Sequence, residues 1–196
     1  MEKRFLIIVF LLITSVAHSK SLDSLCKKKN AIACKDFGMR TKIPIYLQKA
    51  CDLNLGSGCM ELGLRNFKEK KVEEGEIAFK KGCKLNDGDS CSYLGAIFHK
   101  KGELENARLL YTKACQLKSG KGCYNLGILN EKNGDEAEAL KYYLKACDNN
   151  IAQGCVNYAY FLEKNKGEQN QVIILYKKAC DLKSDLGCQN LGQLNK

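Results

Sequence analysis

The sequence predicts an all-α fold made of repeated helix pairs, and the regular spacing of its cysteines is the main reason. The twelve cysteines form six pairs, and seven residues separate the two partners of every pair. The pairs recur every 32 residues from Cys51 to Cys147, and the last pair follows after 33 residues at Cys180. A fixed period of this length is typical of an α/α solenoid, in which each repeat packs only on its neighbours.

Apolar and small residues keep the same phase as the cysteines. An apolar residue stands three positions after the second cysteine of each pair: Phe37, Leu62, Leu94, Leu126, Tyr158 and Leu191. An aromatic residue stands four positions before the first cysteine of the last four pairs: Phe79, Tyr111, Tyr143 and Tyr176. Glycine or alanine follows each residue of the first set directly. We expect the large residues to form the core and the small ones to mark close helix crossings.

Each repeat is predicted to contain two antiparallel helices, named helix A and helix B in chain order. In one repeat, helix A spans about residues 121–131 and helix B about residues 136–147, where Tyr143 and other apolar residues share one face. The turn at residues 133–135 offers a glycine that can end one helix and an aspartate that can cap the next.

The cysteines are predicted to form one disulfide within every pair. The first cysteine lies near the end of helix B and the second near the start of the next helix A, so a short loop brings them within reach. Closing such a loop stabilises the fold by roughly 2.5 kcal/mol in the chain-entropy model. Zinc is rejected because zinc sites use shorter gaps and because only His99 follows residue 19. The predicted disulfides are Cys26–Cys34, Cys51–Cys59, Cys83–Cys91, Cys115–Cys123, Cys147–Cys155 and Cys180–Cys188.

Residues 1–19 have the pattern of a secretory signal peptide. Lys3 and Arg4 precede an apolar run from Phe5 to Val16, and small residues then stand before a cut near Ser19. The run is too short for a comfortable membrane span, so we expect no stable membrane anchor, although an uncleaved anchor is the alternative. The sequence therefore predicts a secreted or periplasmic protein, and that oxidising location suits twelve cysteines.

Residues 20–196 are predicted to form a single solenoid. Only 16 residues separate Cys34 from Cys51, so the first unit, about 20–50, is expected to be a short N-terminal cap with Pro44 in the first turn of its helix B. The full units are predicted at about 51–82, 83–114, 115–146 and 147–179. Residues 180–196 are expected to form a C-terminal half-unit with helix A alone.

The formal net charge of +10 comes mainly from lysines spread along the whole chain. No cluster of aromatic and basic side chains resembles a nucleic-acid site, and export also argues against nucleic acid as a partner. A solvated basic surface is one interpretation. Attraction to an acidic polymer of the cell envelope is the other.

Three segments carry a resemblance to a known family. Tyr111-Thr-Lys-Ala-Cys, Tyr143-Leu-Lys-Ala-Cys and Tyr176-Lys-Lys-Ala-Cys are each followed by seven residues, a cysteine and usually Leu-Gly. The chain thus resembles disulfide-bonded Sel1-like repeats, relatives of the tetratricopeptide repeat, and in particular the secreted Helicobacter cysteine-rich protein family. This resemblance implies a right-handed α/α solenoid of disulfide-stapled helix pairs. It also implies penicillin binding with weak β-lactamase activity, or a role in extracellular interactions.

No catalytic constellation is visible beside this resemblance. The family's unit has a longer turn between helix A and helix B, so any activity carried by that turn is in doubt here. Ser24-Leu-Cys-Lys27 has the Ser-x-x-Lys spacing of serine β-lactamases, but the Lys-Thr-Gly and Ser-Asp-Asn motifs are missing, and chance explains it better. A metallo-β-lactamase would need several histidines. We expect no metal and no cofactor, and the catalytic residues of any hydrolase stay unknown.

A binding groove is the more defensible site. Nine residues after the second cysteine of four successive pairs stand Lys68, Lys100, Lys132 and Lys164. In the phase of a tetratricopeptide repeat this position is near the end of helix A on the concave side, where lysines attract acidic ligands. The alternative is that these lysines only interact favourably with the helix dipole. The other predicted groove residues are Tyr124, Asn125, Asn157 and Tyr160. A second lysine row, which we interpret as solvated helix ends, is Lys49, Lys81, Lys113, Lys145 and Lys178.

The sequence therefore favours a monomeric scaffold that holds a peptide, protein or peptidoglycan-like ligand in its concave groove. The alternative is a weak β-lactamase and penicillin-binding protein that hydrolyses the β-lactam amide. That alternative is implied by the family resemblance alone.

Overall fold

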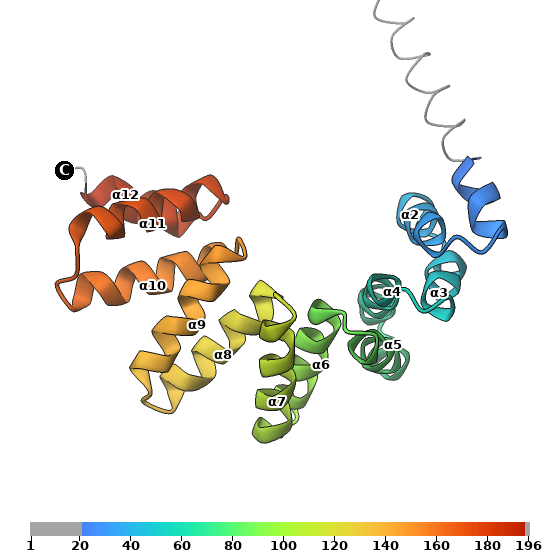
Figure 1. Cartoon of the computed structure of the whole chain (residues 1–196), viewed down its shortest axis with the longest axis horizontal. Coiled ribbons are helices and arrows are strands. Elements are labelled where there is room, and N and C mark those ends of the chain that lie inside the picture. Colours follow the sequence, from blue (N-terminus) through green and yellow to red (C-terminus); the bar gives the residue numbers. More distant parts are fainter. Residues whose placement is uncertain (1–20, 195–196) are drawn as a thin grey trace, which may run out of the picture. The chain divides into compact units, whose positions relative to one another are not determined.

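The computed structural model describes residues 21–194 (Figure 1). The predicted signal peptide, residues 1–19, lies outside the described residues, as do Lys20 and residues 195–196. Within residues 21–194 every regular element is a helix, so the predicted all-α fold is confirmed. The chain divides into two compact units, one ending at Ser90 (the N-unit) and one beginning at Cys91 (the C-unit).

The N-unit contains a short first helix pair and one full pair. Residues 21–27 are helical and lead into α2 (Ala31–Thr41) and α3 (Pro44–Asp52). The full pair is α4 (Gly56–Lys68) and α5 (Val72–Lys84). Pro44 occupies the first turn of α3, which has only nine residues, as expected for a shortened first repeat. Of these helices, α2 and α4 are A helices, and α3 and α5 are B helices.

The C-unit continues the same alternation of A and B helices. Its A helices are α6 (Gly88–Lys100, which begins just before the division), α8 (Gly120–Lys132), α10 (Ala152–Lys164) and α12 (Asp185–Leu194). Its B helices are α7 (Leu104–Gln116), α9 (Glu136–Asp148) and α11 (Gln169–Asp181). The A helices α2, α4, α8 and α10 each pack along the B helix that follows, as α8 and α9 do in Figure 1. No B helix follows α12 within the described residues.

The turn between α8 and α9 has the predicted chemistry. Gly134 has a φ of 81°, a left-handed conformation that glycine adopts without steric cost. The Asp135 carboxylate accepts a hydrogen bond from the backbone N–H of Glu138 at 3.1 Å, so it caps α9. In the turn before α11, Lys166 rather than the neighbouring Gly167 takes the left-handed conformation.

The phased aromatic residues of the B helices form the core, and small residues on the A helices make room for them. Phe79 and Tyr143 are both buried. A Cβ atom added to Gly127 would lie 2.5 Å from Cε1 of Tyr143, and one added to Gly63 would lie equally close to Phe79. Each ring therefore rests directly on the backbone of the preceding A helix, which explains why the small residue keeps its phase along the chain.

Within each unit, disulfides join the end of one helix to the start of the A helix that follows. Five bonds have the expected partners, with Cα atoms between 4.4 and 4.6 Å apart: Cys26–Cys34, Cys51–Cys59, Cys115–Cys123, Cys147–Cys155 and Cys180–Cys188. Cys83 and Cys91 are disulfide-bonded as well. Small residues let the helix ends approach, since a Cβ on Gly122 would be 2.4 Å from the Cβ of Ala114.

None of the helices in residues 21–194 combines the length and the hydropathy that a membrane span needs.

Candidate ligand-binding site

A hollow in the C-unit brings together polar and aromatic side chains from three successive A helices. Its volume is about 310 Å³. We call it the A-face hollow, and its lining is Ser92, Tyr93 and Ala96 of α6, Lys121, Tyr124 and Asn125 of α8, and Ile151 and Gln153 at the start of α10. Tyr124 and Asn125 are two of the residues that the sequence predicted for a groove.

A lysine and a tyrosine are locked together at one edge of this hollow. The Lys121 ammonium donates a hydrogen bond to the Tyr93 hydroxyl at 2.6 Å, and its nitrogen lies 4.6 Å from the centroid of the same ring. A cation over an aromatic face is attracted by the ring quadrupole, so this contact orients Lys121. Sequence reasoning missed Lys121 because it belongs to no lysine row; the residues at its phase in other repeats include Ser57, Asp89 and Gln153.

Next to the hollow, Tyr124 packs against Tyr143, with ring centroids 5.8 Å apart. Burial raises the pKa of Tyr124. The Asn157 side chain lies near the hydroxyls of both tyrosines, and its smaller effect lowers the pKa of each. Tyr124 therefore presents a neutral hydroxyl. Tyr124, Asn125 and Asn157 are thus close together, on two neighbouring A helices.

Two buried tyrosines of the B helices each donate to a glutamate near the end of an A helix. The Tyr143 hydroxyl donates to Glu131, and the Tyr176 hydroxyl donates to Glu163 at 3.0 Å. Burial, then the bond to Glu131, raises the pKa of Tyr143. Burial and the bond to Glu163 raise the pKa of Tyr176 to about 12. These carboxylates were not foreseen, because their partners are brought near only by the packing of helix A on helix B.

The predicted lysine row does not gather in the A-face hollow. Lys100, Lys132 and Lys164 are exposed at the last residues of α6, α8 and α10, and none of them lines the hollow. The Lys164 ammonium nitrogen instead lies 5.9 Å from the ring centroid of Phe161. Tyr160 packs edge-on against the same ring, with 6.1 Å between the two centroids.

Lys68, the first lysine of the row, lines a separate hollow of the N-unit. This hollow has a volume of about 260 Å³, and Lys42 and Arg65 lie beside Lys68 in its lining. Met39 and Leu64 supply apolar surface there. The N-unit therefore has its own hollow between α2, α3 and α4, in which these three basic residues stand with Glu61.

Two lysines of the second row form ion pairs with aspartates of another helix. Lys81 pairs with Asp52 at 3.5 Å, and Lys178 pairs with Asp148 at 3.8 Å. Each pair joins one B helix to the previous one. The interpretation of this row as simple solvated helix ends is therefore incomplete at these two positions.

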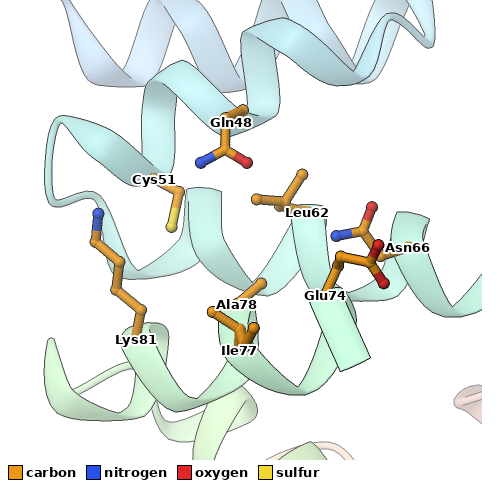
Figure 2. A pocket seen from close by; sticks show the side chains of 8 residues that line it. All are labelled: Gln48, Cys51, Leu62, Asn66, Glu74, Ile77, Ala78 and Lys81. Atoms are coloured by element: carbon orange, nitrogen blue, oxygen red, sulfur yellow. The ribbon is translucent and has the colours of Figure 1, made fainter. Parts of the chain in front are cut away.

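A third hollow lies between α3, α4 and α5 in the N-unit and has a volume of about 190 Å³ (Figure 2). We call it the Ala78 pocket, and it is lined by Gln48, Cys51, Leu62, Asn66, Glu74, Ile77, Ala78 and Lys81. Figure 2 shows Glu74 and Asn66 at one end of the pocket and Lys81 at the other. No residue predicted for ligand binding lines this pocket.

The Ser-x-x-Lys spacing near the N-terminus does not form a catalytic pair. Lys27 forms an ion pair with Asp23 at 2.7 Å, and this hydrogen bond raises the pKa of Lys27. Lys27 is therefore held in its protonated form, which cannot accept a proton from Ser24. His99 lies with its ring edge-on to Tyr111, at 6.5 Å between centroids. The described residues contain no group of side chains that could hold a metal ion.

Solved structures share this arrangement of helices. The crystal structure of a Sel1 repeat protein from Oxalobacter formigenes superposes with a TM-score of 0.75, at 18% identity, over 85% of this chain and 78% of that one. The fold is that of a Sel1-like repeat protein. A protective antigen present in uropathogenic Escherichia coli strains, described as displaying an SLR fold, gives a TM-score of 0.73 at 15% identity over 89% of this chain. This Sel1-like chain spans 43% of that antigen.

A more distant match is YrrB, described as a TPR protein with an unusual peptide-binding site. It has a TM-score of 0.50 at 16% identity, over 88% of this chain and 98% of that one. No protein-family model and no curated protein matches this sequence.

Proposed function

We propose that this protein is an exported Sel1-like scaffold that binds an extended peptide segment of a partner protein at the A-face hollow. The observation that carries the proposal is the hollow itself, in which Tyr93, Lys121, Tyr124 and Asn125 converge from two A helices. Repeat folds of this kind suggest protein binding, and one structural match is described as having a peptide-binding site.

The side chains of the hollow suit a peptide that carries an acidic group. The Asn125 amide can donate to and accept from a peptide bond at the same time. Lys121 supplies a cation for a carboxylate, and the rings of Tyr93 and Tyr124 offer flat apolar surface. Because Tyr93 holds Lys121 and Tyr124 packs against the ring of Tyr143, little side-chain freedom is lost on binding.

Export is the second part of the proposal. The disulfides support an oxidising location, since such bonds persist outside the cytosol. The signal-peptide pattern of residues 1–19 is consistent with the same location. A secreted partner or an envelope component with free carboxylates would meet the hollow there.

Panning a random phage-displayed peptide library on the oxidised chain from residue 20 tests the proposal. Selected peptides are titrated by calorimetry into the wild type and into Tyr124→Ala/Asn125→Ala. We expect the double variant to bind at least about tenfold more weakly, and Lys121→Glu to weaken acidic peptides most. Ile174→Ser, a change at an exposed position of α11, serves as the matched control and should bind like the wild type. Equal affinity of the wild type and the double variant would overturn the proposal.

Hydrolysis of β-lactams stays a prediction of the family resemblance, and no feature of the site favours it. Turnover of nitrocefin by the oxidised protein, compared with buffer alone, decides that question.

A further inference from the structure

The Ala78 pocket exists because one small residue interrupts a row of large ones. Five positions before the first cysteine, the other repeats have Tyr46, Leu110, Tyr142 and Leu175. In the C-unit Leu175 is buried in the core. Ala78 is also buried, but its side chain ends at Cβ, so a space of about 190 Å³ stays open between α3, α4 and α5.

The pocket combines an apolar floor with opposite charges at its two ends. Leu62 and Cys51 are buried at its base, while Ile77 stands at its rim with 67% of its surface exposed. Glu74 and Lys81 mark the two ends, with Ile77 and Ala78 between them (Figure 2). Both charged residues belong to α5 and are seven residues apart, which places them ~10 Å apart along the helix axis.

The exposed face of α5 is complementary to itself when a second α5 runs antiparallel to it. Two acids, Glu73 and Glu74, precede Ile77 by four and three residues, and two bases, Lys80 and Lys81, follow it by three and four. In an antiparallel pair centred on Ile77, Glu73 faces Lys80 of the second copy and Glu74 faces Lys81, because the two members of each pair lie on the same side of Ile77 around the helix axis. A two-fold axis makes every such contact twice, because the same patch serves both copies.

We propose that this face is a homodimer interface, in which Ile77 of each copy enters the Ala78 pocket of the other. The isoleucine supplies the apolar side chain that the repeat lacks at Ala78. The charges at the two ends fix the antiparallel direction and exclude the parallel one, which would place like charges together. This dimer replaces the monomer expected from the sequence. Since the patch is small, the dimer forms in the micromolar to millimolar range.

Another exposed isoleucine in the chain provides a control for this assignment. Ile174 of α11 occupies the same phase as Ile77 and is 65% exposed. Asn170 and Gln171 stand there in place of the two acids, and Leu175 fills the place of Ala78. The α11 face therefore has neither the charge pattern nor the pocket, and it does not pair.

Sedimentation equilibrium of the oxidised chain from residue 20, across micromolar to millimolar concentrations, tests the proposal. The wild type should dimerise, Ile77→Glu should stay monomeric, and Ile174→Glu should dimerise like the wild type. Ala78→Leu should weaken dimerisation at least about tenfold, because it fills the pocket with the residue used in other repeats. A wild type that is monomeric throughout, or equal effects of Ile77→Glu and Ile174→Glu, would overturn it.

Charge-reversal variants distinguish this antiparallel interface from any other contact made by α5. Glu73→Lys/Glu74→Lys and Lys80→Glu/Lys81→Glu should each be monomeric alone, since each makes the face uniformly charged. An equimolar mixture of the two should associate again as a heterodimer. Circular dichroism shows that each variant is folded. A mixture of folded variants that stays monomeric contradicts the antiparallel arrangement.

Discussion

The N-unit and the C-unit differ in the side chains that meet where helix A packs on helix B. The contact involves two positions: the residue eight after the second cysteine of a pair, on helix A, and the phased aromatic residue of helix B. In the N-unit these are Phe67 and Phe79, with ring centroids 5.5 Å apart. The C-unit has Glu131 with Tyr143, and Glu163 with Tyr176, joined by hydrogen bonds. The repeat thus determines where the two side chains meet. Phe67 and Phe79 form a wholly apolar pair, the two Glu–Tyr pairs are hydrogen-bonded, and His99 and Tyr111 at the same two positions pack edge to face.

The phenylalanine of the N-unit pair also depends on a glycine. A Cβ on Gly75 would lie 2.3 Å from Cδ2 of Phe67, so this ring covers the backbone of α5 directly. The same phase in the C-unit has Ala107, Ala139 and Val172, each of which carries the Cβ atom that Gly75 lacks. In the two repeats that have a glutamate in place of Phe67, the residue in place of Gly75 is therefore larger than glycine.

The largest effect is expected when one half of the apolar pair is exchanged. Phe67→Glu should lower the free energy of unfolding by about 2–4 kcal/mol, because it removes ring contacts with Phe79 and Gly75 and places a carboxylate beside an apolar ring. Phe67→Glu/Phe79→Tyr should regain part of this loss by forming the pair found in the C-unit. Urea denaturation of the four proteins of the double-mutant cycle gives the coupling. Additive effects would show that the two positions are independent.

Alkaline pH should distinguish the two units, since only the C-unit has a tyrosine at this core position in the described residues. The pKa of Tyr176 is raised to about 12, above the value of ~10 in an unfolded chain. Its contribution is therefore fully present below pH ~10 and is lost as the pH rises through ~12, up to about 3 kcal/mol in all.

Tyr176→Phe is the control for that pH dependence. Urea midpoints of the wild type and this variant, measured from pH ~9 to ~12, should converge as the pH rises, because phenylalanine does not ionise. Parallel midpoint curves for the two proteins would mean that Tyr176 ionises as easily in the folded protein as in the unfolded chain.

A smaller effect is expected when only the hydroxyl is removed from the polar pair. Tyr143→Phe should destabilise the protein by about 1.5–2 kcal/mol, since the buried hydroxyl donates to the charged Glu131. Hydrogen exchange should show faster opening of α8 and α9 than of α4 and α5. In the N-unit, the reverse change Phe79→Tyr should also destabilise, because Phe67 offers the new hydroxyl no partner. Stabilisation by Phe79→Tyr would contradict the comparison.

The smallest effect is expected for a feature that both units share. Lys81→Ala and Lys178→Ala each remove an ion pair between successive B helices, with the acid 60% and 65% exposed. Exposed pairs contribute about 0.2–1 kcal/mol, so both variants should lose similar small amounts, and less in high salt. Thermal unfolding at two salt concentrations measures this, and a loss confined to one unit would show that the pairs are not equivalent.

The helix pairs, the cap at Asp135 and the disulfides follow from local spacing, and so they could be predicted from the sequence. The Glu131–Tyr143 bond could not, because twelve residues and a turn separate the partners and only packing shows which side chains meet. Lys121 belongs to no periodic pattern, and its role depends on Tyr93 of the previous repeat. The Ala78 pocket was not predicted either, because it depends on how three helices, α3, α4 and α5, pack around one small side chain.

Peptide binding at the A-face hollow is tested most directly by nuclear magnetic resonance of the isotope-labelled, oxidised chain. A peptide selected by panning is added stepwise while the amide resonances are followed. We predict the largest shifts at Tyr93, Lys121, Tyr124 and Asn125, including the side-chain amide of Asn125, and none around Ile174 on α11. Saturable shifts that leave these four residues unchanged, and that cluster elsewhere, would contradict the assignment of the hollow as the binding site.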